Sequence, residues 1–146
     1  MKILVVYDSI AGNTEKVAQA IGNALSGDIR VVRTGEVNPE ALGGIDLLIV
    51  GSPTHGSRPT PEIKTFLGKI PEKGLQNIKV AAFDTRINST FTRLFGHAAS
   101  KIADNLKKKG GNLVIAAEGF IVEGSKGPLK AGELERAALW IKQISL

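Results

Sequence analysis

The chain has 146 residues, of which 42% are hydrophobic and 23% charged, proportions that are ordinary for a globular protein. It contains no cysteine, which excludes disulfides, thiolate metal ligands and a cysteine nucleophile. The formal net charge is +5 with only 5% aromatic residues, so a stacking platform for single-stranded nucleic acid is not expected.

Strand and helix patterns alternate through the first part of the chain. Residues 2–7 form an unbroken apolar run that predicts a central parallel strand, and the amphipathic helix that follows ends at Gly27. Residues 29–33 predict a second strand with polar ends, which favours an edge position. A brief helix or turn is expected at 37–42, and residues 46–51 predict a third strand.

The same alternation continues after a long loop over residues 51–60 that is rich in Gly, Ser, Thr and Pro. Pro61 opens the next helix, and residues 80–83 predict the fourth strand. The following helix carries an apolar stripe, and so does the last helix of the chain. These stripes comprise Leu94, Ala98, Ile102 and Leu106 in the first case and Leu134, Ala138, Ile141 and Ile144 in the second.

Residues 113–117 predict the fifth strand, and residues 119–130 predict an extended connection. Five strands alternating with four or five helices indicate an α/β fold with a parallel sheet covered on both faces. The chain shows no internal repeat, low-complexity segment or linker, so one domain over residues 1–146 is expected.

Three polar loops follow the first, third and fourth predicted strands, at residues 8–14, 51–60 and 84–90. In parallel α/β sheets the ligand lies beyond the carboxyl ends of the strands, where the strand order reverses. All three loops leave carboxyl ends and are rich in Ser, Thr, Gly, Asn or Asp. They therefore predict one ligand site at this edge.

The first of these loops leads from a buried strand directly into a helix and has the features of an anion cradle. Its backbone N–H groups and hydroxyls can face one phosphate, and a helix N-terminus adds unpaired donors and a partial positive charge. The loop holds no Lys or Arg, so neutral donors would hold the anion. The alternative is an ordinary helix cap made by Ser9 or Asn13.

With these loops located, the chain resembles the flavodoxin family, as a short-chain member, over essentially its whole length. The family's phosphate loop reads roughly Thr/Ser-x-Thr-Gly-x-Thr, and residues 9–14 read Ser-Ile-Ala-Gly-Asn-Thr. Residues 51–56, 83–86 and 127–135 are similar to the second flavin loop, the third flavin loop and the family's C-terminal pattern. The resemblance implies a flavodoxin-like doubly wound five-stranded parallel sheet of order 2-1-3-4-5, with one bound FMN used for electron transfer at low potential.

The resemblance also implies which residues contact FMN. Ala11 departs from the family because a hydroxyl is usual there, and the loss of one hydrogen bond to a charged group costs about 1.5–3 kcal/mol. The implied contacts are Ser9, Ile10, Ala11, Gly12, Asn13 and Thr14 at the phosphate, and Ser52, Pro53, Thr54, His55, Gly56, Asp84, Thr85, Arg86 and Ile87 around the ring.

The flavin-ring site also departs from the family, which usually sandwiches the ring between Trp and Tyr. Neither residue type occurs in the three loops. His55 is the candidate for one face, and either Arg86 or Ile87 is the candidate for the other. His55 can instead be an exposed loop histidine without ligand contact, and Arg86 can instead be a surface charge.

Three further roles follow from the resemblance. Thr54 and Thr85 are candidates for the pyrimidine edge of the ring, and Asp84 for a loop cap. A peptide flip at Gly56 would let a carbonyl accept a hydrogen bond from N5–H of the reduced flavin, since Gly tolerates positive φ. Gly56 can also simply form the turn.

A one-electron carrier is the leading hypothesis, because the cofactor carries the chemistry and no acid–base residue is required. The alternative is a small flavoenzyme of the same fold, such as an NAD(P)H:quinone reductase or a porphyrinogen oxidase, in which His55 or Arg86 could meet substrate. A Rossmann dinucleotide site is disfavoured, because no Gly-x-Gly-x-x-Gly follows the first strand. A phosphoacceptor domain is disfavoured because the third strand ends in Gly51-Ser52 rather than Asp.

The expected partners are redox proteins, namely a reductase or ferredoxin-linked donor and an unknown acceptor, with the chain a monomer or weak dimer. The positive charge fits either a solvated lysine-rich surface or an acidic partner. No apolar run approaches the roughly 20 residues that span a bilayer, and no signal-peptide pattern is present. A cytoplasmic location without membrane or nucleic-acid contact is therefore expected.

Overall fold

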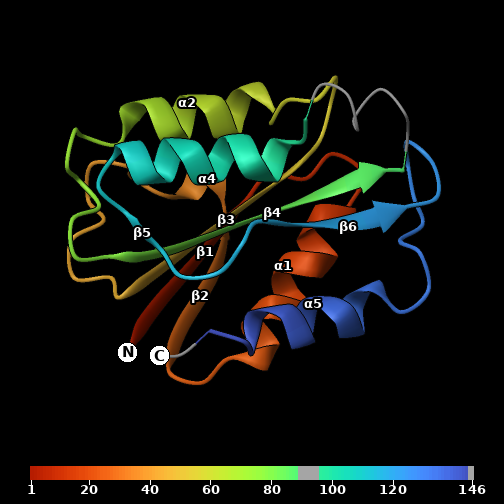
Figure 1. Ribbon diagram of the computed structural model, residues 1–146, viewed down its shortest axis with the longest axis horizontal. Coiled ribbons are helices and arrows are strands. Elements are labelled where there is room, and N and C mark those ends of the chain that lie inside the picture. Colours follow the sequence, from red (N-terminus) through yellow and green to blue (C-terminus); the bar gives the residue numbers. More distant parts are fainter. Residues whose placement is uncertain (89–95, 145–146) are drawn as a thin grey trace.

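The computed structural model describes residues 1–88 and 96–144, and its centre is a parallel sheet with helices on both faces (Figure 1). The strand order is β2-β1-β3-β4-β5, with β6 also paired to β4, and every pair is parallel. This confirms the predicted order 2-1-3-4-5. The strands are β1 (Lys2–Tyr7), β2 (Asp28–Arg33), β3 (Leu47–Pro53), β4 (Lys79–Ile87), β5 (Asn112–Leu113) and β6 (Glu118–Val122).

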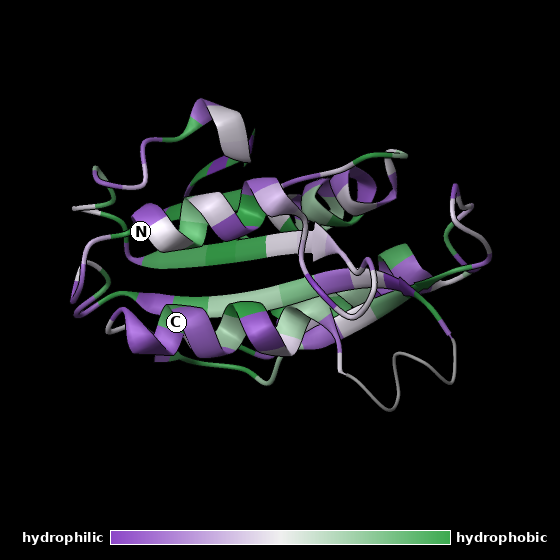
Figure 2. Cartoon of the chain, turned by 90° about the horizontal axis from the view of Figure 1, so that it is seen from above, coloured by the Kyte–Doolittle hydropathy of each residue, from purple (hydrophilic) through white to green (hydrophobic). Residues whose placement is uncertain are grey.

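Helices α1 and α5 pack on one face of the sheet, and α2 and α4 pack on the other (Figures 1 and 2). None of the helices in the described ranges is long and apolar enough to cross a membrane. The helices are α1 (Asn13–Ala24), α2 (Pro61–Lys69), α4 (Ala98–Lys108) and α5 (Glu133–Ile141), with a short 3-10 helix η1 (Thr34–Glu36) after β2.

The apolar core is divided by the sheet into two layers. In β1, Ile3 and Val5 face the α1/α5 layer, while Leu4 and Val6 face the α2/α4 layer. Central strands β1 and β3 are buried on both sides, which explains why they appear in the sequence as unbroken apolar runs.

The fifth strand position is filled by two short strands, which corrects the prediction of one strand at 113–117 and an extended connection at 119–130. Leu113 pairs with Val80, and Glu118 pairs with Phe83, so the four residues 114–117 lie opposite only two residues of β4. This is a bulge, and Nε1 of Trp140 donates to the carbonyl of residue 116 within it. The buried Phe120 belongs to a strand rather than to a connection.

Two smaller boundaries complete the comparison with the sequence prediction. The segment 37–42 forms the turn that was one of its two expected forms, with the N–H of Ala41 donating to the carbonyl of Asn38, and a short helical turn in this region lies earlier, at η1. Helix α4 begins at Ala98, and the predicted Leu94 lies outside the described residues.

Candidate functional site

A cavity of about 490 Å³ lies at the carboxyl ends of the strands, between the loops that follow β1, β3, β4 and β6. This volume is within the range of small-molecule sites, roughly 300–1,000 Å³. Eleven of the fifteen predicted residues line it, namely Ser9, Ile10, Ala11, Asn13, Thr14, Pro53, Thr54, His55, Thr85, Arg86 and Ile87. The predicted residues outside its lining are Gly12, Ser52, Gly56 and Asp84.

The β1–α1 loop presents unpaired backbone donors to this cavity. Gly12 has φ +92°, a left-handed conformation that turns the chain into α1. The hydroxyl of Ser9 accepts from the N–H groups of Gly12 (3.1 Å) and Glu15 (3.4 Å), so Ser9 partly acts as the helix cap considered above. Within the described part of the chain, no acceptor meets the N–H groups of Ile10, Ala11, Asn13 and Thr14.

A buried hydroxyl pair joins this loop to the end of β4. Oγ1 of Thr14 and Oγ1 of Thr85 lie 2.8 Å apart, and both side chains are almost fully buried. The carbonyl of Thr85 also accepts from the N–H of Thr54, at 2.8 Å. The three predicted ligand loops are therefore connected directly to one another.

Arg33, at the end of β2, holds the β1–α1 loop by a hydrogen bond to Ser9 and does not line the cavity. Its Nη1 donates to the carbonyl of Ser9 at 2.8 Å, and its guanidinium pairs with Asp8 (3.6 Å) and Glu15 (3.4 Å). The guanidinium carbon also lies 5.3 Å from the ring centre of Tyr7. The cation of Arg33 is thus already paired with carboxylates on the outer side of the loop.

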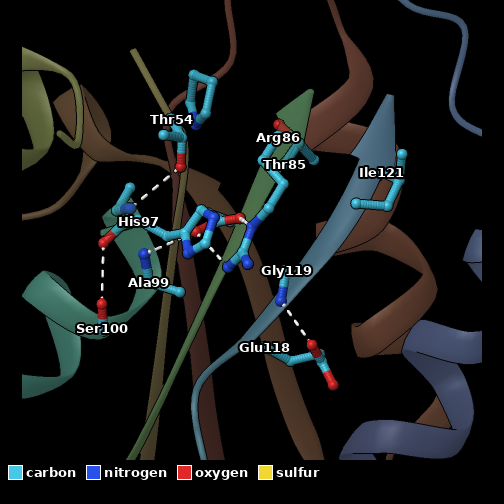
Figure 3. Close-up of polar contacts among 12 residues, drawn as sticks. Thr54, Thr85, Arg86, His97, Ala99, Ser100, Glu118, Gly119 and Ile121 are labelled. Carbon is cyan, nitrogen blue, oxygen red and sulfur yellow. Dashed lines mark hydrogen bonds and ion pairs between the residues drawn. The ribbon is translucent and has the colours of Figure 1, made fainter. Parts of the chain in front are cut away.

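Asp84 forms a structural ion pair and does not line the cavity. Its fully buried carboxylate accepts from Nε (2.7 Å) and Nη2 (2.9 Å) of Arg86 and from the N–H of Ala99 (2.9 Å), in the first turn of α4. Figure 3 shows the Arg86 guanidinium between this helix end and Gly119 of β6. Asp84 therefore caps α4, and its charge is neutralised by Arg86.

Two hydroxyls of the β3–α2 loop form hydrogen bonds with the protein's own backbone. Oγ1 of Thr54 accepts from the N–H of Ala98 at 3.1 Å, as a second cap of α4 (Figure 3). Oγ of Ser52 donates to the carbonyl of Pro53 (2.8 Å) and accepts from the N–H of Thr60 (3.0 Å). Ser52 therefore fixes the loop's shape from within the core.

Residues 55–58 form a tight turn at the rim of the cavity. His55 and Arg58 exchange two backbone hydrogen bonds, of 2.9 and 3.0 Å, around Gly56 (φ +56°) and Ser57 (φ +67°). Nζ of Lys101 in α4 donates to the carbonyl of Ser57. The side chain of His55 is exposed at the rim and lines the cavity.

Two large apolar side chains are exposed beside this turn. Ile10 of the phosphate loop is 69% exposed and Ile87 at the end of β4 is 44% exposed, and both line the cavity. Exposed apolar surface at the mouth of a cavity is available to an apolar part of a ligand. The lining of the cavity therefore combines exposed apolar side chains with unpaired N–H donors.

Three lining residues were missed from the sequence: Val122, Ser125 and Lys126, all in or directly after β6. The sequence predicted an extended connection at residues 119–130, and nothing in that prediction placed the connection at the site. The structure brings the segment to the site through Gly127, which adopts φ +95° and packs closely against the side chain of Asn13, a contact that the sequence pattern does not indicate.

His97 lies directly before α4, near the Asp84–Arg86 pair (Figure 3). Burial lowers the pKa of His97, and repulsion from the Arg86 guanidinium lowers it further, against an opposing effect of Asp84. His97 is therefore held in its neutral form to lower pH than an exposed histidine, which avoids a second cation beside Arg86.

Two sequence comparisons relate this chain to known proteins. A sequence model of the flavodoxin domain family matches residues 4–127. A curated protein described as "Probable flavodoxin 1" of Bacillus subtilis (strain 168) is 30% identical over 86 residues. That alignment covers 56% of this chain and 54% of the relative, so the chain spans about half the length of the curated relative that it matches.

The solved structures show the same fold. A flavodoxin from the domain Archaea superposes with a TM-score of 0.82 at 24% identity, covering 99% of this chain and 96% of the other. Rubredoxin oxygen:oxidoreductase of Desulfovibrio gigas superposes with a TM-score of 0.77 at 22% identity, covering 98% of this chain but only 35% of that larger protein. The fold therefore occurs both as a small protein and as part of a larger oxidoreductase.

Proposed function

The chain belongs to the flavodoxin family, and from this membership we propose that it binds FMN in the cavity described above and transfers electrons between redox proteins. The observation that carries the proposal is the set of four unpaired N–H groups in the β1–α1 loop and the first turn of α1, on residues that line a cavity with exposed apolar side chains. Such donors at a helix N-terminus suit a phosphate, and the rim suits an aromatic ring system.

The phosphate end fits the cofactor as follows. The N–H groups of Ile10, Ala11, Asn13 and Thr14 are available to phosphate oxygens, and the hydroxyl of Ser9 already lies within the loop. The left-handed Gly12 turns the chain between these residues without itself lining the cavity. Water or backbone donors would take the place of the hydroxyl that Ala11 lacks.

At the ring end, the contacts favour Ile87 over Arg86 as the partner of His55. The Arg86 guanidinium is bound to Asp84 through two hydrogen bonds, and moving it over a ring would leave a buried carboxylate unpaired. Ile87 is exposed at the rim and needs no such rearrangement. We therefore assign one ring face to His55 and the other to Ile87.

For Thr54 and Thr85, backbone groups are the better candidates for the pyrimidine edge, since both hydroxyls already have partners in the protein.

Gly56 is the candidate for a redox-linked peptide flip. A Cβ at Gly56 would meet nothing within 4 Å, and glycine adopts either sign of φ at small cost.

Bound FMN would supply one- and two-electron redox chemistry, which needs no acid or base from the protein. Among the described lining residues, the titratable side chains are His55, Arg86 and Lys126, with no carboxylate. This composition favours a carrier.

The second candidate is a flavoenzyme such as a quinone reductase or porphyrinogen oxidase, with His55 meeting substrate, because the same fold forms part of a larger oxidoreductase.

In this proposal residues 1–146 act as one domain in the cytoplasm, as a monomer or weak dimer. The donor would be a reductase or a ferredoxin-linked protein. The acceptor is a second redox protein, and neither nucleic acid nor a membrane takes part.

Absorption spectroscopy of the purified protein with and without added FMN tests the proposal. We expect flavin bands, shifted from those of free FMN, that co-elute with the protein. A colourless protein that does not retain FMN contradicts the proposal. Steady turnover of NAD(P)H with a quinone would instead favour the enzyme.

A further inference from the structure

Lys126 is the charged side chain of the cavity that the flavodoxin resemblance did not indicate. It lines the cavity together with Val122 and Ser125, in the segment between β6 and α5. Resting on the proposed function, we infer that Lys126 is a cofactor-positioning residue that binds the phosphate of FMN. It thereby supplies the positive charge that residues 9–14 lack.

The backbone of this segment is folded tightly enough to place Lys126 in a defined position. The N–H of Glu123 donates to the carbonyl of Pro128 (2.9 Å), and the N–H of Lys130 donates to the carbonyl of Ile121 (2.9 Å). At the tip, the N–H of Gly127 donates to the carbonyl of Gly124 (3.0 Å). Lys126 therefore lies in a closed turn that leads back from the tip of β6 toward α5 (Figure 1).

The next residue joins this turn to the phosphate loop. A Cβ placed on Gly127 would lie 2.8 Å from both Nδ2 and Oδ1 of Asn13, so the backbone at Gly127 packs against the Asn13 side chain too closely for any residue but glycine. Asn13 is the first residue of α1 and one of the four with an unpaired N–H. Lys126 is therefore attached directly before the residue that packs against the start of α1, beside the unpaired N–H groups of the β1–α1 loop.

Among the described residues, the other two cations near the cavity are already paired with carboxylates, so Lys126 is the one available to a ligand. Arg33 is paired with Asp8 and Glu15 on the outer side of the loop, and Arg86 is paired with the buried Asp84. Lys126 is exposed and has no ion-pair or hydrogen-bond partner within residues 1–88 and 96–144. It is thus the one lining cation in the described part of the chain that is free to pair with a ligand.

The chemistry of the ligand matches that free charge. A phosphate monoester carries a charge of about −1.5 to −2 at pH 7, and neutral N–H donors alone do not balance it. A lysine ammonium near the phosphate adds a charge-assisted hydrogen bond. It would therefore raise affinity for FMN but leave affinity for riboflavin, which lacks the phosphate, unchanged.

Titration of the apoprotein with FMN and with riboflavin, followed by flavin fluorescence, tests the inference. For Lys126→Gln we expect a roughly tenfold weaker FMN affinity and an unchanged riboflavin affinity. Lys126→Arg should retain most of the FMN affinity. Lys130→Gln is the matched control, because Lys130 is in the same segment but does not line the cavity, and it should bind FMN like the wild type. Added salt should weaken FMN binding more in the wild type than in Lys126→Gln.

The outcomes separate this inference from the proposed function. Wild-type protein that binds neither flavin contradicts the proposed function itself. Wild-type binding of FMN with an unchanged affinity in Lys126→Gln overturns the inference alone. Equal losses for FMN and riboflavin, or an equal loss in Lys130→Gln, also overturn it, because the effect would then not arise from Lys126 and the phosphate. Thermal unfolding of each apoprotein checks that the variants fold.

Discussion

Asp84 shows how the tertiary structure can reassign a single residue. Its place directly after an apolar strand made it a candidate for flavin contact, and a loop cap was the other role considered. The structure buries its carboxylate completely, bound to Arg86 and to the N–H of Ala99. A buried ion pair that also caps a helix is a structural feature, since removing one charge leaves the other without a partner.

We predict that Asp84→Asn lowers the free energy of unfolding by about 3 kcal/mol, because Arg86 loses its counter-charge in a largely buried position. Urea unfolding followed by circular dichroism measures this. Asp104→Asn is the control: Asp104 forms an exposed pair with Lys107 in α4, and we expect its loss to cost within about 0.5 kcal/mol. Equal effects in the two variants would contradict a structural role for Asp84.

At the scale of elements, a glycine allows the short strand β6 to pack closely against a side chain of β4. A Cβ on Gly119 would lie 2.0 Å from Cζ and Nε of Arg86, whose guanidinium is fixed by Asp84. On the other side, the carboxylate of Glu133 in α5 accepts from the N–H of Ile121 at 2.7 Å. The guanidinium of Arg86 in β4 and the carboxylate of Glu133 in α5 thus both contact β6. The segment that contains Lys126 follows directly from β6.

We expect Gly119→Ala to cost about 3 kcal/mol, because the added methyl group forces Arg86 away from Asp84. Gly68→Ala is the matched control. Gly68 lies in α2 with nothing within 4 Å of its Cβ position, so alanine should add about 0.5–1 kcal/mol of stability there. Chemical unfolding measures both.

The double variant Gly119→Ala/Asp84→Asn provides a further check. Both substitutions disrupt the same ion pair, so their combined cost should be smaller than the sum of the single costs. Additive costs would mean that Gly119 acts through something other than Arg86.

At the scale of the whole molecule, the net charge of +5 decides which partners are attracted. Lys126 lines the cavity, while Arg58 is exposed in the turn at 55–58 and Lys101 donates to the carbonyl of Ser57 in the same turn. Glu123 is the exposed carboxylate in the segment that holds Lys126. The balance favours an acidic partner, since opposite charges steer encounter and like charges slow it.

We predict that electron transfer from the FMN-loaded protein to an acidic redox protein slows as salt is raised from about 0.01 M to 0.5 M, where screening shortens the range of electrostatic attraction. Transfer to a basic redox protein should accelerate over the same range. Stopped-flow absorption gives both rates. Rates that do not change with salt would show that the net charge has no part in docking.

The sequence by itself determined the architecture and most of the lining of the site. Unbroken apolar runs, turn residues and polar loops at strand ends depend on local chain chemistry, and they predicted a parallel α/β sheet with a ligand site at one edge. The resemblance to the flavodoxin family implied the strand order and fifteen contact residues, eleven of which line the cavity. Four features required the tertiary structure: the bulge that divides the fifth strand, the ion pair of Asp84 and Arg86, the support of the phosphate loop by Arg33, and the position of Lys126. Each depends on contacts between residues distant in the chain, such as Gly127 on Asn13, and local pattern carries no information about such contacts.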